Sequence, residues 1–117
     1  MKLIIAGSRG IYLEPLLLDS FFDSLGIPLP SEVVCGLARG MDLAGKDWAG
    51  DKGILVKEFP ADWEKHGKGA GYVRNQAMAE YADELLAFWD GKSKGTAHMI
   101  SCMLGHSKPF QVILIRP

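Results

Sequence analysis

The stretch Leu85-Leu86-Ala87-Phe88-Trp89-Asp90-Gly91-Lys92-Ser93-Lys94-Gly95-Thr96 joins an apolar run to a glycine-rich turn. Residues 85–89 predict a buried strand, and residues 97–104 predict a helix that Thr96 caps. A strand, a turn with lysines between glycines, and a helix start place backbone N–H groups and positive charge at one point. The turn therefore suits an anionic group, although a flexible strand-to-helix connection with solvated lysines fits the same residues.

Apolar runs alternate with helical patterns along the whole chain. Strands are expected over residues 2–6, 32–35, 54–59, 85–89 and 110–115, and helices over residues 15–25, 42–49, 72–82 and 97–104. Asp42 is a good N-cap for the second helix, with its stop at Gly50 or Gly53. Residues 61–71 are polar and glycine-rich, so we expect an irregular binding loop there. This alternation predicts an α/β fold, a Rossmann-like three-layer sandwich with a mostly parallel five-stranded sheet.

Composition limits the classes of protein that the chain can belong to. Its 117 residues suit a single domain, residues 1–117, and 48% hydrophobic with 23% charged residues argues against disorder. The net charge is −1, from 13 Lys and Arg against 14 Asp and Glu. Attraction of the whole surface to nucleic acid is therefore excluded, and any anion site must be local.

Cysteine and histidine spacing gives no sign of a metal site. Cys35 and Cys102 lack a CxxC pattern, and we interpret them as reduced, partly buried thiols of a cytoplasmic protein. The three histidines lack metal-ligand spacing, so we expect neither a metal nor a cofactor. No apolar run approaches the roughly 18 residues of a membrane span, so no membrane association is expected.

Three glycine-bearing turns follow the first, second and fourth predicted strands. In a parallel sheet such turns meet at the carboxyl edge, where ligands bind beside the point at which strand order reverses. Arg9 and Arg39 in two of these turns can hold a phosphate, and Arg74 near a helix start is unfavourable to the helix dipole unless an anion joins it. The alternative for Arg9 is that it belongs only to a tight turn, and for Arg39 that it belongs only to a plain helix start. The alternative for Arg74 is an ordinary surface charge.

Two aromatic residues, Trp63 and Tyr72, flank the glycine-rich segment. They are candidates to stack on a nucleobase, while the alternative is that they hold the loop against the core. The candidate ligand-binding residues are Gly7, Ser8, Arg9, Gly36, Arg39, Gly40, Asp42, Trp63, Arg74, Asn75, Asp90, Gly91, Ser93, Lys94, Gly95 and Thr96.

Four regions follow one another in an order known from other proteins. They are Ile4-Ile5-Ala6-Gly7-Ser8-Arg9; Gly36-Leu37-Ala38-Arg39-Gly40-Met41-Asp42; Phe59-Pro60-Ala61-Asp62-Trp63 with Gly67-Lys68-Gly69-Ala70-Gly71 and Arg74-Asn75-Gln76-Ala77-Met78; and Ala87-Phe88-Trp89-Asp90-Gly91 with Ser93 and Gly95-Thr96. With these regions the chain resembles the SLOG superfamily, more closely its YspA-like group of bacterial and phage proteins. The resemblance implies a Rossmann-like fold and a relation to three kinds of protein. These are the lysine-decarboxylase-like phosphoribohydrolases, which cleave nucleoside monophosphates into base and ribose 5-phosphate; single-stranded DNA binders such as DNA-processing protein A; and proteins thought to sense nucleotide-derived signals.

The motifs of those hydrolases are matched only in part. Arg74 and Met78 fit their Arg-Lys-x-x-Met pattern, with Asn75 at the lysine position. Their Pro-Gly-Gly-x-Gly-Thr-x-Glu-Glu pattern is not kept, because the loop is one residue longer and His98 and Met99 stand where the glutamates would be. Cleavage of an N-glycosidic bond needs a carboxylate to stabilise the oxocarbenium-like transition state. The sequence favours neither Asp42 nor Asp90 as a replacement.

These observations predict a module that binds or senses a nucleotide or nucleotide-derived ligand, with no catalytic residue assigned. Hydrolysis of the N-glycosidic bond of a nucleoside phosphate is the first alternative, and single-stranded DNA binding is the second. The first helix carries Leu16, Leu17, Leu18, Phe21 and Phe22, more apolar surface than one buried stripe needs. A homo-oligomer contact would use the excess, and burial within the monomer is the rival explanation.

Overall fold

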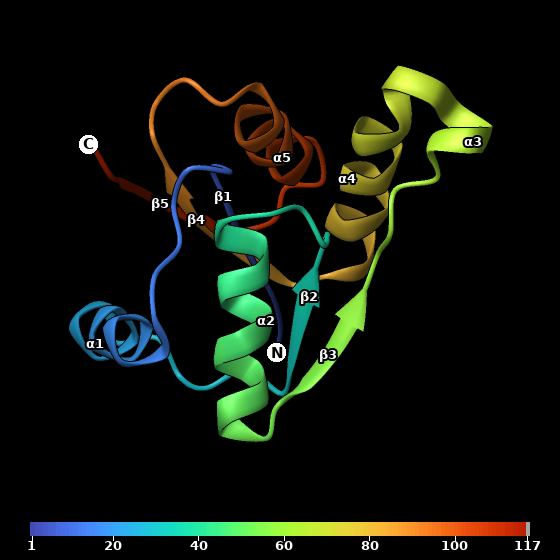
Figure 1. Ribbon diagram of the computed structural model, residues 1–117. Coiled ribbons are helices and arrows are strands. Elements are labelled where there is room, and N and C mark those ends of the chain that lie inside the picture. The colour runs from blue at the N-terminus through green and yellow to red at the C-terminus, as the bar shows by residue number, and fades with distance from the viewer. Residues whose placement is uncertain (117) are drawn as a thin grey trace.

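The computed structural model describes residues 1–116, which form a five-stranded sheet between two layers of helices (Figure 1). The strands are β1 (Lys2–Gly7), β2 (Glu32–Cys35), β3 (Leu55–Glu58), β4 (Glu84–Trp89) and β5 (Phe110–Leu114). The helices are α1 (Pro15–Leu25), α2 (Met41–Lys52), α3 (Trp63–His66), the 3₁₀ turn η1 (Gly67–Gly69), α4 (Ala70–Tyr81) and α5 (Lys94–Gly105). The strand order is β3-β2-β1-β4-β5, and every neighbouring pair is parallel. The predicted Rossmann-like sandwich is therefore confirmed, with strand order reversing between β1 and β4.

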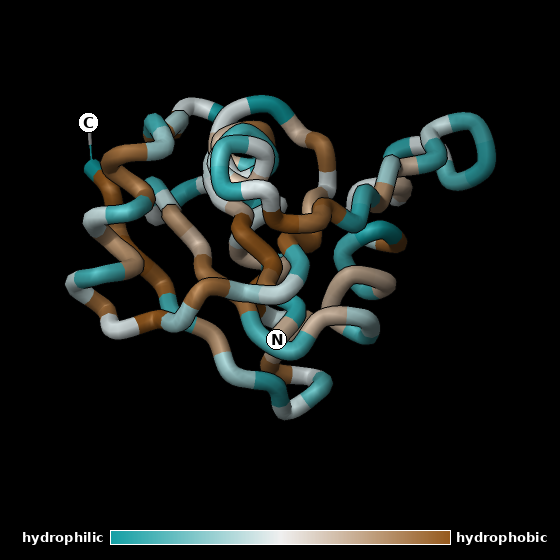
Figure 2. The backbone as a smooth tube through the Cα atoms, turned by 90° about the horizontal axis from the view of Figure 1, so that it is seen from below, coloured by the Kyte–Doolittle hydropathy of each residue, from teal (hydrophilic) through white to brown (hydrophobic). Residues whose placement is uncertain are grey.

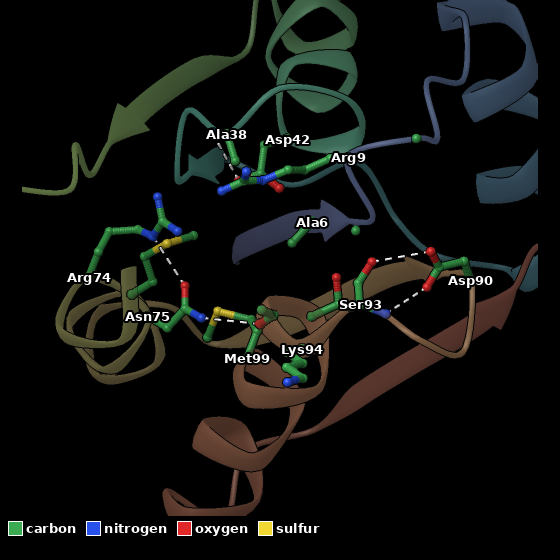
Figure 3. A pocket seen from close by; sticks show the side chains of 15 residues that line it. Ala6, Arg9, Ala38, Asp42, Arg74, Asn75, Asp90, Ser93, Lys94 and Met99 are labelled. Atoms are coloured by element: carbon green, nitrogen blue, oxygen red, sulfur yellow. Dashed lines mark hydrogen bonds between the residues drawn. The ribbon is translucent and has the colours of Figure 1, made fainter. Parts of the chain in front are cut away.

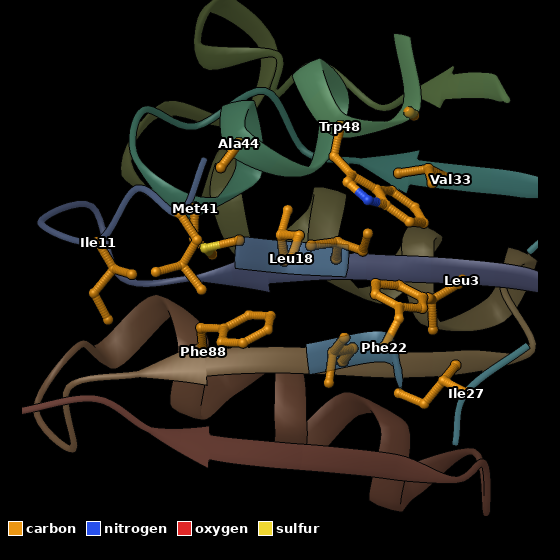
Figure 4. Close-up of a cluster of buried hydrophobic side chains, with 14 residues drawn as sticks. Leu3, Ile11, Leu18, Phe22, Ile27, Val33, Met41, Ala44, Trp48 and Phe88 are labelled. Carbon is orange, nitrogen blue, oxygen red and sulfur yellow. The ribbon is translucent and has the colours of Figure 1, made fainter. Parts of the chain in front are cut away.

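Two separate cores lie on the two faces of the sheet. α1 and α2 cover one face, where Leu18, Phe22 and Trp48 lie against alternate residues of β1 and β4 (Figure 4). The rings of Phe22 and Trp48 stack with centroids 4.4 Å apart. α4 and α5 cover the other face, where Met78 and Met103 lie against the intervening residues of the same strands. Burial on both faces explains why these strands read as continuous apolar runs.

The start of α2 differs from the prediction. Gly40 is the N-cap, with φ of 83°, and the helix begins at Met41, so the N-cap role expected for Asp42 is wrong. Asp42 instead lies inside the first turn, where its carboxyl accepts a hydrogen bond from the N–H of Ala38 at 3.3 Å. The side chain thereby closes the β2–α2 loop from within the helix.

The start of α5 differs in the same sense. The helix begins at Lys94 with Ser93 at the N-cap, so the cap role expected for Thr96 is wrong. The cause is the Asp90 carboxylate, which accepts hydrogen bonds from the N–H groups of Lys92 and Ser93, each at 2.8 Å. This side chain folds the turn tightly and lets the helix begin earlier. Thr96 becomes a buried residue of the first turn.

Residues 63–71 are helical, so the irregular loop expected over residues 61–71 is also wrong. The carboxylate of Asp62 accepts a hydrogen bond from the N–H of Lys65 at 3.1 Å and caps the single turn of α3. η1 follows, and α4 begins at Ala70. α3 and η1 project from the body of the fold, and the projecting tube is mostly hydrophilic (Figure 2).

The apolar residues of α1 divide between core and surface. Leu18 and Phe22 are buried, whereas Leu16 is 80% exposed and Leu17 is 47% exposed. Burial within the monomer thus accounts for part of the excess, and self-association through the exposed part stays a prediction. Among residues 1–116, no helix is both long and apolar enough to cross a membrane.

Candidate functional site

A pocket of about 430 Å³ opens at the carboxyl edge of the sheet, where the loops after the adjacent strands β1 and β4 lead to opposite faces (Figure 3). Its walls come from the end of β1, the β2–α2 loop with the first turn of α2, the first half of α4, and the β4–α5 turn. The volume is within the range of small-molecule sites. The pocket lies where the order of strands places ligands in open parallel sheets.

The structure brings most of the predicted site residues together in this pocket. Those that line it are Gly7, Arg9, Asp42, Arg74, Asn75, Asp90, Ser93, Lys94, Gly95 and Thr96. The predicted residues outside its lining are Ser8, Gly36, Arg39, Gly40, Trp63 and Gly91. Lining residues that the sequence did not single out are Ala6, Gly10, Ala38, Met78 and Met99.

Ser8 supports the pocket from behind. Its side chain is 1% exposed, and its hydroxyl oxygen accepts a hydrogen bond from the N–H of Asp90 at 3.0 Å. Its carbonyl oxygen accepts from the N–H groups of Ile11 and Met41, at 3.1 and 3.4 Å. Ser8 therefore ties together the three loops that the pocket is made from.

Two glycines allow these loops to approach one another. A Cβ atom on Gly40 would lie 2.4 Å from the carbonyl oxygen of Arg9, and the φ of 83° at Gly40 also disfavours other residues. A Cβ atom on Gly36 would lie 2.9 Å from Oδ2 of Asp42 and 3.1 Å from Cδ of Arg74. Both glycines thus act on the pocket without lining it.

The first turn of α5 presents unpaired backbone donors. The N–H groups of Lys94, Gly95 and Thr96 have no acceptor within residues 1–116. Thr96 is 5% exposed, lines the pocket, and has no hydrogen-bond partner for its hydroxyl among the described residues. Asp90 organises the turn, and its pKa is lowered first by the N–H groups of Ser93 and Lys92. The indole N–H of Trp89 holds the same turn by donating to the carbonyl oxygen of Ser93 at 3.0 Å.

Asn75 joins α4 to this turn. Its amide nitrogen donates to the carbonyl oxygen of Gly95 at 3.2 Å, and its amide oxygen accepts from Nε of Arg74 at 3.1 Å. Arg74 also donates from Nη1 to the carbonyl oxygen of Gly36 at 2.5 Å. These bonds fix the guanidinium at the side of the pocket and leave Nη2 without an acceptor in the described part of the chain.

Asp42 is a buried carboxyl in the pocket wall. It is 6% exposed, and burial raises its pKa to about 6. The guanidinium of Arg74, the N–H groups of Ala38 and Gly7 and, more weakly, Arg9 act in the opposite direction and lower the pKa. Asp42 forms no salt bridge within residues 1–116.

The floor of the pocket is apolar, with Ala6, Met78 and Met99 lining it. The expected aromatic cover lies elsewhere. Trp63 is 55% exposed on α3, and the ring of Tyr72 contacts the ring of His98 with centroids 4.2 Å apart, outside the pocket lining.

His98 lies outside this pocket, among side chains of α4 and α5. Nδ1 of its ring lies 3.1 Å from the amide nitrogen of Asn75, and Sγ of Cys102 lies 3.6 Å from Nε2. Burial lowers the pKa of His98 and raises that of Cys102, which does not favour a reactive thiolate. Within residues 1–116, no group of His, Cys, Asp or Glu side chains is arranged to hold a metal ion.

A phage protein is similar in sequence to this chain. No family model matches the chain. No solved structure matches it either. The chain is 38% identical over 104 residues to the Gene 61 protein of Mycobacterium phage D29, an alignment that covers 83% of each protein. The chain therefore belongs to the same protein family as this phage Gene 61 protein.

Proposed function

We propose that this protein binds a nucleotide or nucleotide-derived ligand in the pocket and holds its phosphate at the start of α5. The observation that carries the proposal is the set of unpaired N–H groups of residues 94–96 together with the hydroxyl of Thr96. α5 has 12 residues, so the positive end of a complete helix dipole lies at the same point. Backbone donors at the start of a helix are a common phosphate site in proteins.

Two arginines supply charge around this point. Arg9 is exposed at the pocket and forms no salt bridge within residues 1–116. Arg74 is held by Gly36 and Asn75, and its Nη2 is left for a ligand oxygen. An arginine that is positioned before the ligand arrives loses less conformational entropy on binding. The proposed phosphate would therefore contact the exposed guanidinium of Arg9, which is unpaired within residues 1–116, and the positioned guanidinium of Arg74.

The floor of the pocket supports an aromatic ring as the remainder of the ligand. Met78 and Met99 offer polarisable thioethers, which interact favourably with aromatic rings. In this proposal the base lies on these methionines, in place of the cover expected from Trp63 and Tyr72. The resemblance to the SLOG superfamily supports a nucleotide over other phosphorylated compounds.

Calorimetric titration with nucleoside monophosphates, diphosphates and inorganic phosphate tests the proposal. Arg9→Gln should weaken binding about tenfold or more, since hydrogen bonds to charged groups contribute about 1.5–3 kcal/mol. Arg39→Gln is the matched control, because Arg39 is also an exposed arginine of a neighbouring loop but does not line the pocket. Equal effects of the two substitutions would contradict the assigned site, and no binding by the wild-type protein would contradict the function.

Cleavage of the N-glycosidic bond remains the second candidate because a carboxyl with a raised pKa, that of Asp42, faces the pocket. Chromatography of the protein incubated with nucleoside monophosphates should then reveal free base. Release of no base would leave binding as the function. Single-stranded DNA binding, the third candidate, predicts affinity for labelled strands that falls with salt concentration.

A further inference from the structure

The hydrogen-bond donors and acceptors of the pocket lie on opposite walls. The start of α5 with Ser93 forms one wall, and Asp42 lies on the opposite wall beyond the end of β1 at Ala6 (Figure 3). One wall therefore offers hydrogen-bond donors, and the other offers the oxygens of a carboxyl that is 94% buried. One end of a ligand would therefore contact hydrogen-bond donors, and the other end would contact a carboxyl acceptor.

The protein pairs the Asp42 carboxyl only with backbone N–H groups, those of Ala38 and Gly7, and with no side-chain donor among residues 1–116. Its hydrogen bond from the N–H of Ala38 is long, at 3.3 Å. Arg74, the arginine that lowers the pKa of Asp42 most, donates its hydrogen bonds to the carbonyl oxygen of Gly36 and to Asn75 instead. A buried carboxylate without a direct salt bridge is costly unless hydrogen-bond donors surround it. Lone pairs of this carboxyl thus remain for a group that enters the pocket.

Room for the carboxyl is built into the loop. The absence of a side chain at Gly36 leaves space for Oδ2 of Asp42, which a Cβ atom there would approach to 2.9 Å. Closing the β2–α2 loop needs an acceptor for the N–H of Ala38, and the N–H of Gly7 also acts on this carboxyl. The oxygen of a neutral amide side chain has two lone pairs and would supply such an acceptor equally well. A structural role alone therefore does not explain a charged group at this position.

We propose that Asp42 is the second anchor of the ligand and accepts hydrogen bonds from a pair of O–H or N–H donors. This inference rests on the proposed function, because the phosphate at the start of α5 sets the ligand's direction. The paired donors are the vicinal hydroxyls of a ribose or the amino and imino edge of a base, which share this chemistry. A carboxylate wall also repels a second anionic group, so the pocket selects ligands with a phosphate at one end and donors at the other.

Titration calorimetry at neutral pH tests the inference with AMP, GMP, CMP, UMP, their 2′,3′-dideoxy counterparts and inorganic phosphate. Asp42→Asn should lower affinity for the ribonucleotides that bind wild-type protein by about tenfold or more, because it removes a charged acceptor. Its affinity for inorganic phosphate should stay the same or rise. Asp51→Asn, an exposed position on the same helix, is the control and should change neither.

The ligand series distinguishes the two sources of donors in wild-type protein alone, and so does not depend on the folding of any variant. A tenfold loss on going to the dideoxy nucleotides assigns the ribose hydroxyls, and a preference among bases that persists in the dideoxy series assigns the base edge. Indifference to both changes would overturn the inference. The inference would also be overturned if the Asp42→Asn variant bound nucleotides with wild-type affinity, or if its affinities for phosphate and for nucleotides fell equally. Either result would leave the proposed function intact. Wild-type protein that binds no nucleotide would overturn both.

Discussion

Replacing Asp42 with asparagine should stabilise the protein at neutral pH. Burial raises the pKa of this carboxyl to about 6 from its ordinary value of 3.8. The difference corresponds to about 3 kcal/mol of folding free energy that is lost when the group ionises, at about 1.4 kcal/mol for each pKa unit. Asparagine has the same shape, keeps an oxygen for the N–H of Ala38 and carries no charge. We therefore expect Asp42→Asn to raise the free energy of unfolding at pH 7.5 by up to about 3 kcal/mol.

The effect should depend on pH in a defined direction. Since the pKa of Asp42 is raised in the folded state, its favourable contribution is complete below the ordinary pKa of 3.8 and is lost as pH rises through about 6. The gap between variant and wild type should then be smallest near pH 4, widen between about pH 4 and 6, and level off above about pH 7. Asp51→Asn should show no such profile, because Asp51 is exposed.

Urea-induced unfolding followed by circular dichroism at several pH values measures this gap. A gap that does not change with pH, or a wild-type protein more stable than Asp42→Asn at pH 7.5, would refute the reasoning. The expected result would show that the pocket retains a carboxyl at the expense of stability, as functional sites often do.

Three further predictions concern the framework around the pocket. Gly40→Ala should destabilise the protein by about 2 kcal/mol or more, because the added Cβ would clash with the β1–α1 loop and the φ of this residue is positive. Gly50→Ala, with open space around it in α2, should instead stabilise the protein by about 0.5 kcal/mol. Thermal unfolding of both variants measures the difference, and equal effects would contradict the prediction. Cys35 and Cys102 are buried, and burial raises the pKa of both thiols, that of Cys35 to about 11. An aromatic disulfide reagent at pH 8 should therefore label neither cysteine until urea unfolds the protein, and rapid labelling of the native protein would contradict their placement. Leu16 is 80% exposed, so sedimentation should show self-association that Leu16→Glu reduces, and a monomeric wild type at high concentration would remove the idea.

The layered fold was predictable because its determinants are local. Buried parallel strands appear as short apolar runs, and the glycines that end α1 and α2 mark their boundaries in the sequence. The convergence of three loops at one edge followed from parallel topology alone.

Side chains that bind backbone groups explain the mistakes about helix starts. Asp62 begins a helical turn in a segment with an unfavourable composition, and Asp90 moves the start of α5 ahead of Thr96. Such bonds depend on the geometry of the loop, which composition does not specify.

Which residues line the pocket was harder to predict than where in the fold the pocket lies. Met78 and Met99 have the spacing of core residues, and nothing in the sequence distinguishes a pocket floor from a core. Trp63 resembled a stacking residue, but its position on the projecting α3 depends on tertiary structure. The burial of Asp42, which raises its pKa, likewise arises only when Gly36 and Arg74 pack around it.

The most direct test of the proposed phosphate site is a nuclear magnetic resonance titration of the ¹⁵N-labelled protein with the nucleoside monophosphates and with inorganic phosphate. We predict saturable shifts of the backbone N–H resonances of Lys94, Gly95 and Thr96, because these donors have no acceptor within residues 1–116 and would gain one. Shifts that leave these three resonances unchanged while others move, or no saturable shift with any of these compounds, would contradict the account.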